Sequence, residues 1–126
     1  MRLTVTAAGP ADPDEVWDRY MHPDRWAQWS PQITSVDYPD AAISTGGRGT
    51  VHGPCGLGVA FEIIDVDAEK RSWSWHVAVA GVRLTLHHDV SAQRSGTRTG
   101  LGIDGPAPVV VLYAPIARLA LGRLVR

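Results

Sequence analysis

The most informative stretch of this chain is DPDEVWDRYMHPDRWAQWSP, residues 12–31, because it predicts two short helices near the front of a strand-rich protein. Asp12 can accept a hydrogen bond from the first helical turn, Pro13 suits the first helical position, and Glu15 follows the cap by three residues. The His-Pro pair at 22–23 should then end this helix. A second short helix follows it.

Alternation of polar and apolar residues predicts seven strands around this helical pair, and neighbouring strands can all pair antiparallel. They are expected at Arg2 to Ala8, Ile33 to Tyr38, Gly49 to Gly53, Gly58 to Val66, Ser72 to Ala80, Val82 to Val90 and Thr97 to Ile103.

From Pro106 onward the spacing becomes helical, and Pro115 is expected to kink this last helix. The predicted apolar stripe comprises Val109, Leu112, Tyr113, Ile116, Leu119, Ala120 and Leu124. Without repeats or linkers, residues 1–126 are expected to form one α+β domain.

Composition narrows the class of protein. The 12 basic and 13 acidic residues give a formal net charge of -1, which carries no overall electrostatic signal for nucleic acid or an anionic membrane. Cys55 is the only cysteine, so no internal disulfide can form, and the alternating N-terminus does not resemble a signal peptide. A cytoplasmic protein is therefore expected. The longest apolar run, residues 109–117, is too short to predict a membrane span.

The pattern of the central strands predicts a cavity. Trp73 and Trp75 share one face of their strand, and in the next strand His88 shares a face with Leu84 and Leu86. The C-terminal helix would cover this face, leaving a void of roughly 300 Å³ or more. Small residues expected to leave that space are Gly56, Gly58, Ala60, Ala78 and Ala80.

Several segments together resemble the polyketide cyclase/dehydrase and lipid-transport family of the START-like (SRPBCC) helix-grip superfamily. They are Pro13 to Trp17, Asp24 to Pro31, Arg71 to Trp75, the Gly96-Thr97 turn and the amphipathic C-terminal helix. The resemblance implies a helix-grip fold, in which a curved antiparallel sheet wraps around the C-terminal helix, with a hydrophobic ligand pocket between them.

We therefore expect a small hydrophobic or aromatic molecule to bind between the sheet and the last helix, without a cofactor. The expected pocket wall comprises Trp26, Trp29, Phe61, Trp75, Leu86, His88 and Tyr113, with Trp26 and Trp29 near its mouth.

Two other functions remain open. In a polyketide cyclase or aromatase, His88 would transfer protons while Tyr113 or Thr97 stabilised an enolate oxygen; otherwise His88 is a core histidine satisfied by a neighbouring group. The third reading is a protein-interaction module that uses the sheet edge or the last helix. The oligomeric state stays open.

Other chemistries find little support. His87 and Asp89 point away from His88 along a strand, so these three residues cannot hold one metal ion. The glycines of residues 100–105 match a dinucleotide-binding pattern, but no second parallel strand can follow them. Cys55 has no residue pattern that would orient it as a nucleophile.

Overall fold

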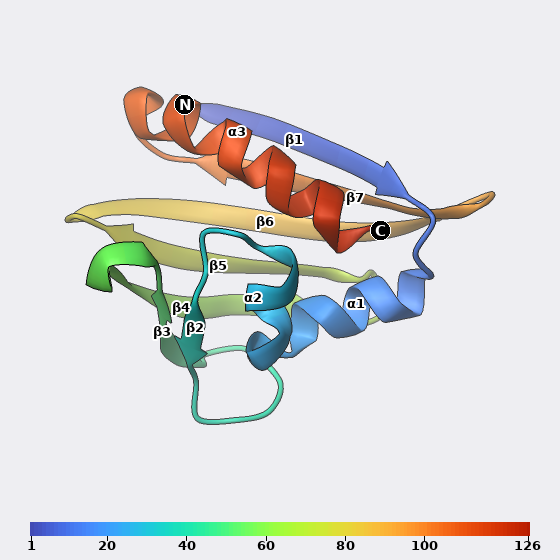
Figure 1. The fold of residues 1–126 in the computed structure, drawn as a ribbon, viewed down its shortest axis with the longest axis horizontal. Coiled ribbons are helices and arrows are strands. Elements are labelled where there is room, and N and C mark those ends of the chain that lie inside the picture. Colours follow the sequence, from blue (N-terminus) through green and yellow to red (C-terminus); the bar gives the residue numbers. More distant parts are fainter.

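A computed structural model describes residues 1–126 as one seven-stranded antiparallel sheet, in the order β1-β7-β6-β5-β4-β3-β2, with three α-helices. The helix α3 lies across the sheet beside β1, while α1 and α2 cover the rest of the same side (Figure 1). The strands are β1 (Arg2–Gly9), β2 (Ser35–Asp37), β3 (Arg48–His52), β4 (Gly58–Asp67), β5 (Ser72–Val79), β6 (Val82–Gln93) and β7 (Gly96–Asp104). The helices are α1 (Pro13–Met21), α2 (Trp26–Trp29) and α3 (Ala107–Leu124), with 3₁₀ turns at Pro23–Arg25 and Pro54–Gly56.

The predicted pair of short helices is present. The Asp12 side chain accepts a hydrogen bond from the backbone N–H of Asp14 at 2.8 Å, which caps α1. His22 has an extended backbone and ends the helix, and the 3₁₀ turn that begins at Pro23 leads into α2. The buried Trp26 indole donates to the carbonyl oxygen of Tyr20 at 2.8 Å, so the two helices are held together.

Most strand predictions hold, with local differences at the ends. β2 is shorter than expected because the Ile33 N–H bonds to the Ser30 carbonyl in a turn instead of joining the sheet. β6 is longer, since its pairing with β7 continues to Gln93 opposite Gly96. An irregularity between Ile63 and Asp65 of β4 shifts the register against β5. Such a bulge bends the sheet, which helps it curve around α3.

The buried face of α3 overlaps only in part with the predicted one, since Ala120 and Leu124 belong to both. Its buried residues are Val110, Ala114, Ala117, Ala120, Leu121 and Leu124, whereas Leu112, Ile116 and Leu119 of the expected stripe are exposed. The helix is apolar on almost every side, so hydrophobicity alone could not identify the buried face. Alanines on the inner face let the helix approach the sheet closely.

Pro115 does not interrupt α3, which continues from residue 107 to residue 124. A proline removes the hydrogen bond to the carbonyl four residues earlier, here that of Val111. Val111 is exposed, so water can reach this part of the helix and the loss is small.

The C-terminal end of α3 is fixed by α1 and by the segment that precedes it. Arg19 donates to the carbonyl oxygen of Leu124 at 2.6 Å, and the Ala11 N–H donates to that of Val125 at 3.0 Å. These bonds satisfy carbonyl groups that a helix end otherwise leaves unpaired.

By length and hydropathy α3 could cross a membrane, but one of its faces belongs to the core. It is the core helix of this fold, and no membrane span is indicated.

Candidate functional site

A cavity of about 280 Å³ lies between the central strands, α2 and α3. This volume is near the lower end of the range for small-molecule pockets. Hydrophobic side chains form most of the wall. The sheet contributes Val51, Val59, Trp73, Trp75, Val77, Val79, Leu84, Leu86, His88 and Leu101; the helices contribute Trp26, Trp29, Tyr113, Ile116, Ala117, Ala120 and Leu121. Connecting segments add Ser30, Gln32, Ile33, Gly53, Pro54 and Leu57.

The space does not come from the small residues that the sequence suggested. Ala60 and Ala78 pair with each other on the exposed side of the sheet. Ala117 and Ala120 of α3 line the cavity instead, and their short side chains leave room beneath the helix. The space is therefore provided by other small residues, of which Ala120 belongs to the predicted stripe of α3 and Ala117 does not.

Of the seven residues expected in the wall, the structure brings six to the cavity: Trp26, Trp29, Trp75, Leu86, His88 and Tyr113. Phe61 lies outside the wall. Its ring packs against Tyr38, Trp26 and Trp75, with centroid distances of 5.9, 5.7 and 5.2 Å, so Phe61 supports the two wall tryptophans without lining the cavity itself.

Sequence reasoning missed the wall residues between α2 and β2 and in the turn before β4. Gln32, Ile33, Pro54 and Leu57 belong to these segments. Leu57 was the one available signal, since a large apolar residue is unusual in a glycine-rich turn. In the structure it is 50% exposed.

An aromatic cluster supports the cavity from the sheet side. The Trp73 and His88 rings stack in neighbouring strands, with centroids 4.4 Å apart and planes 8° from parallel. Trp26 stacks on Trp73 at 5.7 Å and meets Trp75 edge to face at 5.2 Å. Rings held on several sides have few rotamers available, so this wall is rigid.

His88 lies at the centre of a buried chain of hydrogen bonds. Trp75 Nε1 donates to His88 Nε2 at 3.0 Å, which requires the neutral ring to carry its proton on Nδ1 because an indole can only donate. His88 Nδ1 then donates to the Tyr20 hydroxyl at 3.2 Å, and Tyr20 donates to Thr99 Oγ1 at 2.7 Å. Thr99 completes the chain by donating to the Asp89 carbonyl at 2.8 Å.

This environment keeps His88 neutral. Burial lowers the pKa of His88 to about 3, and the neighbouring His87 contributes in the same direction. Burial also raises the pKa of the Tyr20 hydroxyl. The lone pair that a general base would use is on Nε2, and it already accepts the Trp75 proton.

The other polar residues considered for catalysis or metal binding lie outside the hydrogen-bond chain of His88. Thr97 donates to the Ala11 carbonyl at 2.7 Å and does not line the cavity, so it is not placed to stabilise an enolate there. Tyr113 does line it, and burial raises the pKa of its hydroxyl while Gln32 partly opposes that rise. His87 lies outside the cavity and is 3.3 Å from Asp104. No group of three or more potential metal ligands occurs in the structure.

A curved antiparallel sheet closed over a cavity by its C-terminal helix defines a helix-grip protein, and solved structures share this fold. Ara h 8.0201 superposes with a TM-score of 0.72 at 12% identity, over 98% of this chain and 97% of that one. An uncharacterised protein from Bacillus thuringiensis superposes with a TM-score of 0.81 at 15% identity, over 98% of this chain and 96% of that one. DynU16, from the dynemicin biosynthetic locus, superposes with a TM-score of 0.80 at 21% identity, over 98% of this chain and 45% of that one.

The chain belongs to the polyketide cyclase/dehydrase and lipid-transport family, whose sequence model matches residues 1–126. No curated protein matches it. At these levels of identity the solved structures establish the fold alone.

Proposed function

We propose that this protein binds a small aromatic or otherwise hydrophobic molecule in the cavity beneath α3. The cavity itself carries this proposal: about 280 Å³ enclosed mainly by tryptophan, leucine, valine and alanine side chains. Transfer of apolar surface from water into such a space is favourable by roughly 25 cal/mol per Å². The volume suits a molecule of one or two rings better than a long lipid.

The cavity wall includes two residues with unpaired polar atoms. Two buried side-chain polar atoms have no hydrogen-bond partner, Trp73 Nε1 and Gln32 Oε1, and both residues belong to the wall. A buried polar group without a partner costs about 1 to 3 kcal/mol. Neither atom is open to the cavity, so a ligand hydroxyl pairs with the indole N–H or the amide oxygen only if the wall shifts on binding. A phenol-like probe tests this, because a pure hydrocarbon cannot form such a bond.

Cyclisation of a polyketide is the competing function, since the family description includes cyclases and DynU16 comes from a biosynthetic locus. The surroundings of His88 support binding instead. A general base needs a free lone pair and a pKa near the working pH. His88 Nε2 is engaged by Trp75, and the pKa of His88 lies near 3.

The test is titration with 2-naphthol, followed by quenching of tryptophan fluorescence. Ala117→Leu and Ala120→Leu extend side chains into the cavity and are expected to weaken binding at least about tenfold, or 1.4 kcal/mol. Ala78→Leu adds the same atoms on the exposed side of β5 and serves as the matched control. Equal affinity in all three variants, or no binding by the natural sequence, would contradict the proposal.

A further inference from the structure

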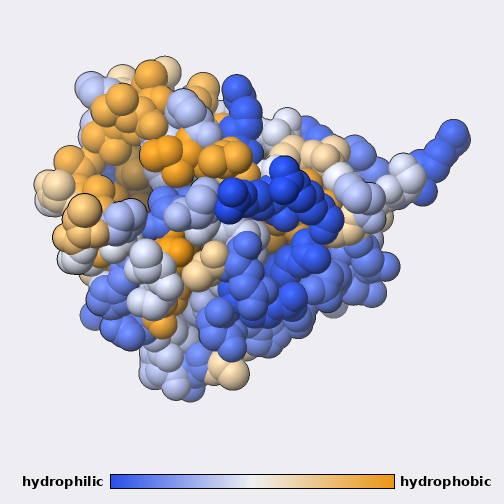
Figure 2. All heavy atoms as spheres, viewed as in Figure 1, coloured by the Kyte–Doolittle hydropathy of each residue, from blue (hydrophilic) through white to orange (hydrophobic).

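The outward face of α3 presents an unusual amount of apolar surface. Leu112 is 75% exposed, Val111 53%, Leu119 52% and Ile116 42%. In the space-filling view, apolar atoms gather over the N-terminal part of this helix (Figure 2). Ile116 and the half-exposed Leu57 also line the cavity, so this apolar patch is continuous with the cavity mouth.

Positive charge follows the patch along the same helix. No acidic residue occurs after Asp104, whereas Arg118, Arg123 and Arg126 are exposed and their side chains form no ion pair. The net charge of -1 conceals this separation, because the acidic residues lie earlier in the chain. The face therefore combines apolar side chains with unpaired guanidinium groups.

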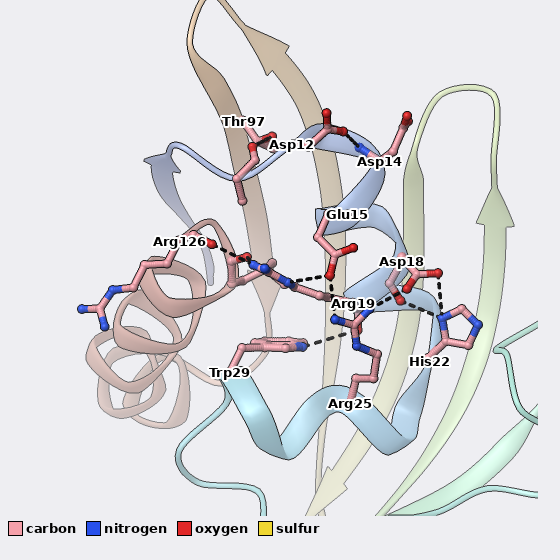
Figure 3. A network of polar contacts seen from close by, with 12 residues as sticks. Asp12, Asp14, Glu15, Asp18, Arg19, His22, Arg25, Trp29, Thr97 and Arg126 are labelled. Atoms are coloured by element: carbon pink, nitrogen blue, oxygen red, sulfur yellow. Dashed lines mark hydrogen bonds and ion pairs between the residues drawn. The ribbon is translucent and has the colours of Figure 1, made fainter.

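A second pocket, of about 250 Å³, lies where the end of α3 meets α1 and α2. Its wall consists of Arg19, Arg25, Gln28, Trp29, Arg123 and Arg126; Figure 3 shows part of this region. We call it the arginine pocket.

Two of its arginines are held in place by acidic groups of α1. Arg25 donates to Glu15 at 2.6 Å and to Asp18 at 2.5 Å, and Arg19 lies 3.4 Å from Glu15. Arg19 and Arg25 are therefore engaged by carboxylates, whereas the side chains of Arg123 and Arg126 form no ion pair. Guanidinium groups bind phosphate oxygens with good geometry, so the arginine pocket can accept a phosphate group.

We propose that the exposed face of α3 and the arginine pocket together bind an anionic phospholipid bilayer, with a headgroup phosphate in the pocket and the cavity mouth against the membrane. A helix with exposed leucines and isoleucine beside arginines suits the membrane interface. Charge complementarity favours a bilayer over a second copy of this chain, because a second α3 offers the same arginines and no acidic residue. Membrane binding by this surface is a separate function from the ligand binding proposed for the cavity.

The test is co-sedimentation with phosphatidylcholine vesicles, with and without about one third phosphatidylglycerol. The protein is expected to bind the anionic vesicles at least about tenfold more tightly, and less tightly as salt rises. Arg123→Gln combined with Arg126→Gln should weaken vesicle binding roughly 30-fold, since each arginine near an anionic surface raises the affinity about fivefold. Leu112→Ser combined with Leu119→Ser should weaken it roughly tenfold or more.

Two exposed residues away from this face provide matched controls: Ile64→Ser on β4 and Arg83→Gln on the outer face of β6. Both should bind vesicles as the natural sequence does. Measured 2-naphthol affinity in every variant separates a loss of membrane binding from a loss of the cavity.

Three results would overturn the proposal. The first is equal binding to neutral and anionic vesicles, and the second is binding of inorganic phosphate without vesicle binding. The third is a natural-sequence protein that does not bind vesicles but forms a dimer, where the leucine variants are monomeric. The last result would assign the α3 face to a second copy of the chain.

Discussion

At the residue level, His88 shows how burial determines the chemistry of a side chain. Its two nitrogens connect an indole N–H to a tyrosine hydroxyl, and the chain of donors ends on a backbone carbonyl. Every proton in this chain has an acceptor only while His88 is neutral, because protonation of Nε2 would place two N–H groups against each other. His88 therefore contributes to a specific core arrangement.

This arrangement predicts sensitivity to acid. The folded protein binds a proton on His88 only near pH 3, whereas the unfolded chain does so near pH 6.5. Between these values the unfolded state binds more protons, so the free energy of unfolding falls as pH decreases from about 6.5 towards 3, and this loss ends below pH 3.

Urea unfolding at pH 7 and pH 5 measures the effect. From pH 7 to pH 5, the free energy of unfolding of the natural sequence should fall by about 2 kcal/mol more than that of His88→Gln, because glutamine cannot be protonated. His76→Gln, on the other face of the sheet, is the control and should retain the pH dependence of the natural sequence. The same loss in His88→Gln would show that other groups cause it.

At the level of elements, the joint between β1 and the end of α3 determines how closely the helix lies on the sheet. A Cβ atom at Gly9 would be 2.3 Å from the carbonyl oxygen of Val125, and that carbonyl already accepts from the Ala11 N–H. The close approach is between backbones, so no side-chain rotation can relieve a clash.

Gly9→Ala is therefore expected to lower the free energy of unfolding by about 1 to 3 kcal/mol, because the end of α3 must move away from β1. Urea unfolding checks this. At Gly58 of β4 an added Cβ would lie 3.6 Å from Thr50, an ordinary contact, so Gly58→Ala should change stability by no more than about 0.5 kcal/mol. Similar effects at both positions would mean that the joint is not tightly packed.

For the whole molecule, the cavity couples ligand binding to stability. A molecule that binds only the folded state stabilises it in proportion to the logarithm of ligand concentration. With free 2-naphthol at 100 times its dissociation constant, the free energy of unfolding should rise by about 2.7 kcal/mol.

Thermal unfolding with and without 2-naphthol measures this gain. At the same ligand concentration Ala117→Leu should show a much smaller rise, whereas Ala78→Leu should match the natural sequence. A rise that persists in Ala117→Leu would indicate binding elsewhere on the protein.

Local sequence signals determined much of this fold. The Asp12 cap, the break at residues 22–23 and the alternation of the strands act over a few residues, and the observed elements follow them closely. Alternation also placed His88 and Trp75 on the inner face, because side chains of a strand point to opposite sides in turn.

Only the tertiary structure decided which side of α3 is buried. A helix that is apolar all round has no preferred face by itself, and close packing against β1 selects the alanine-containing side. The cavity depends on that choice, since Ala117 and Ala120 provide its space. The partners of His88 and the four arginines that line one pocket likewise come from residues far apart in sequence, and no local pattern encodes such contacts.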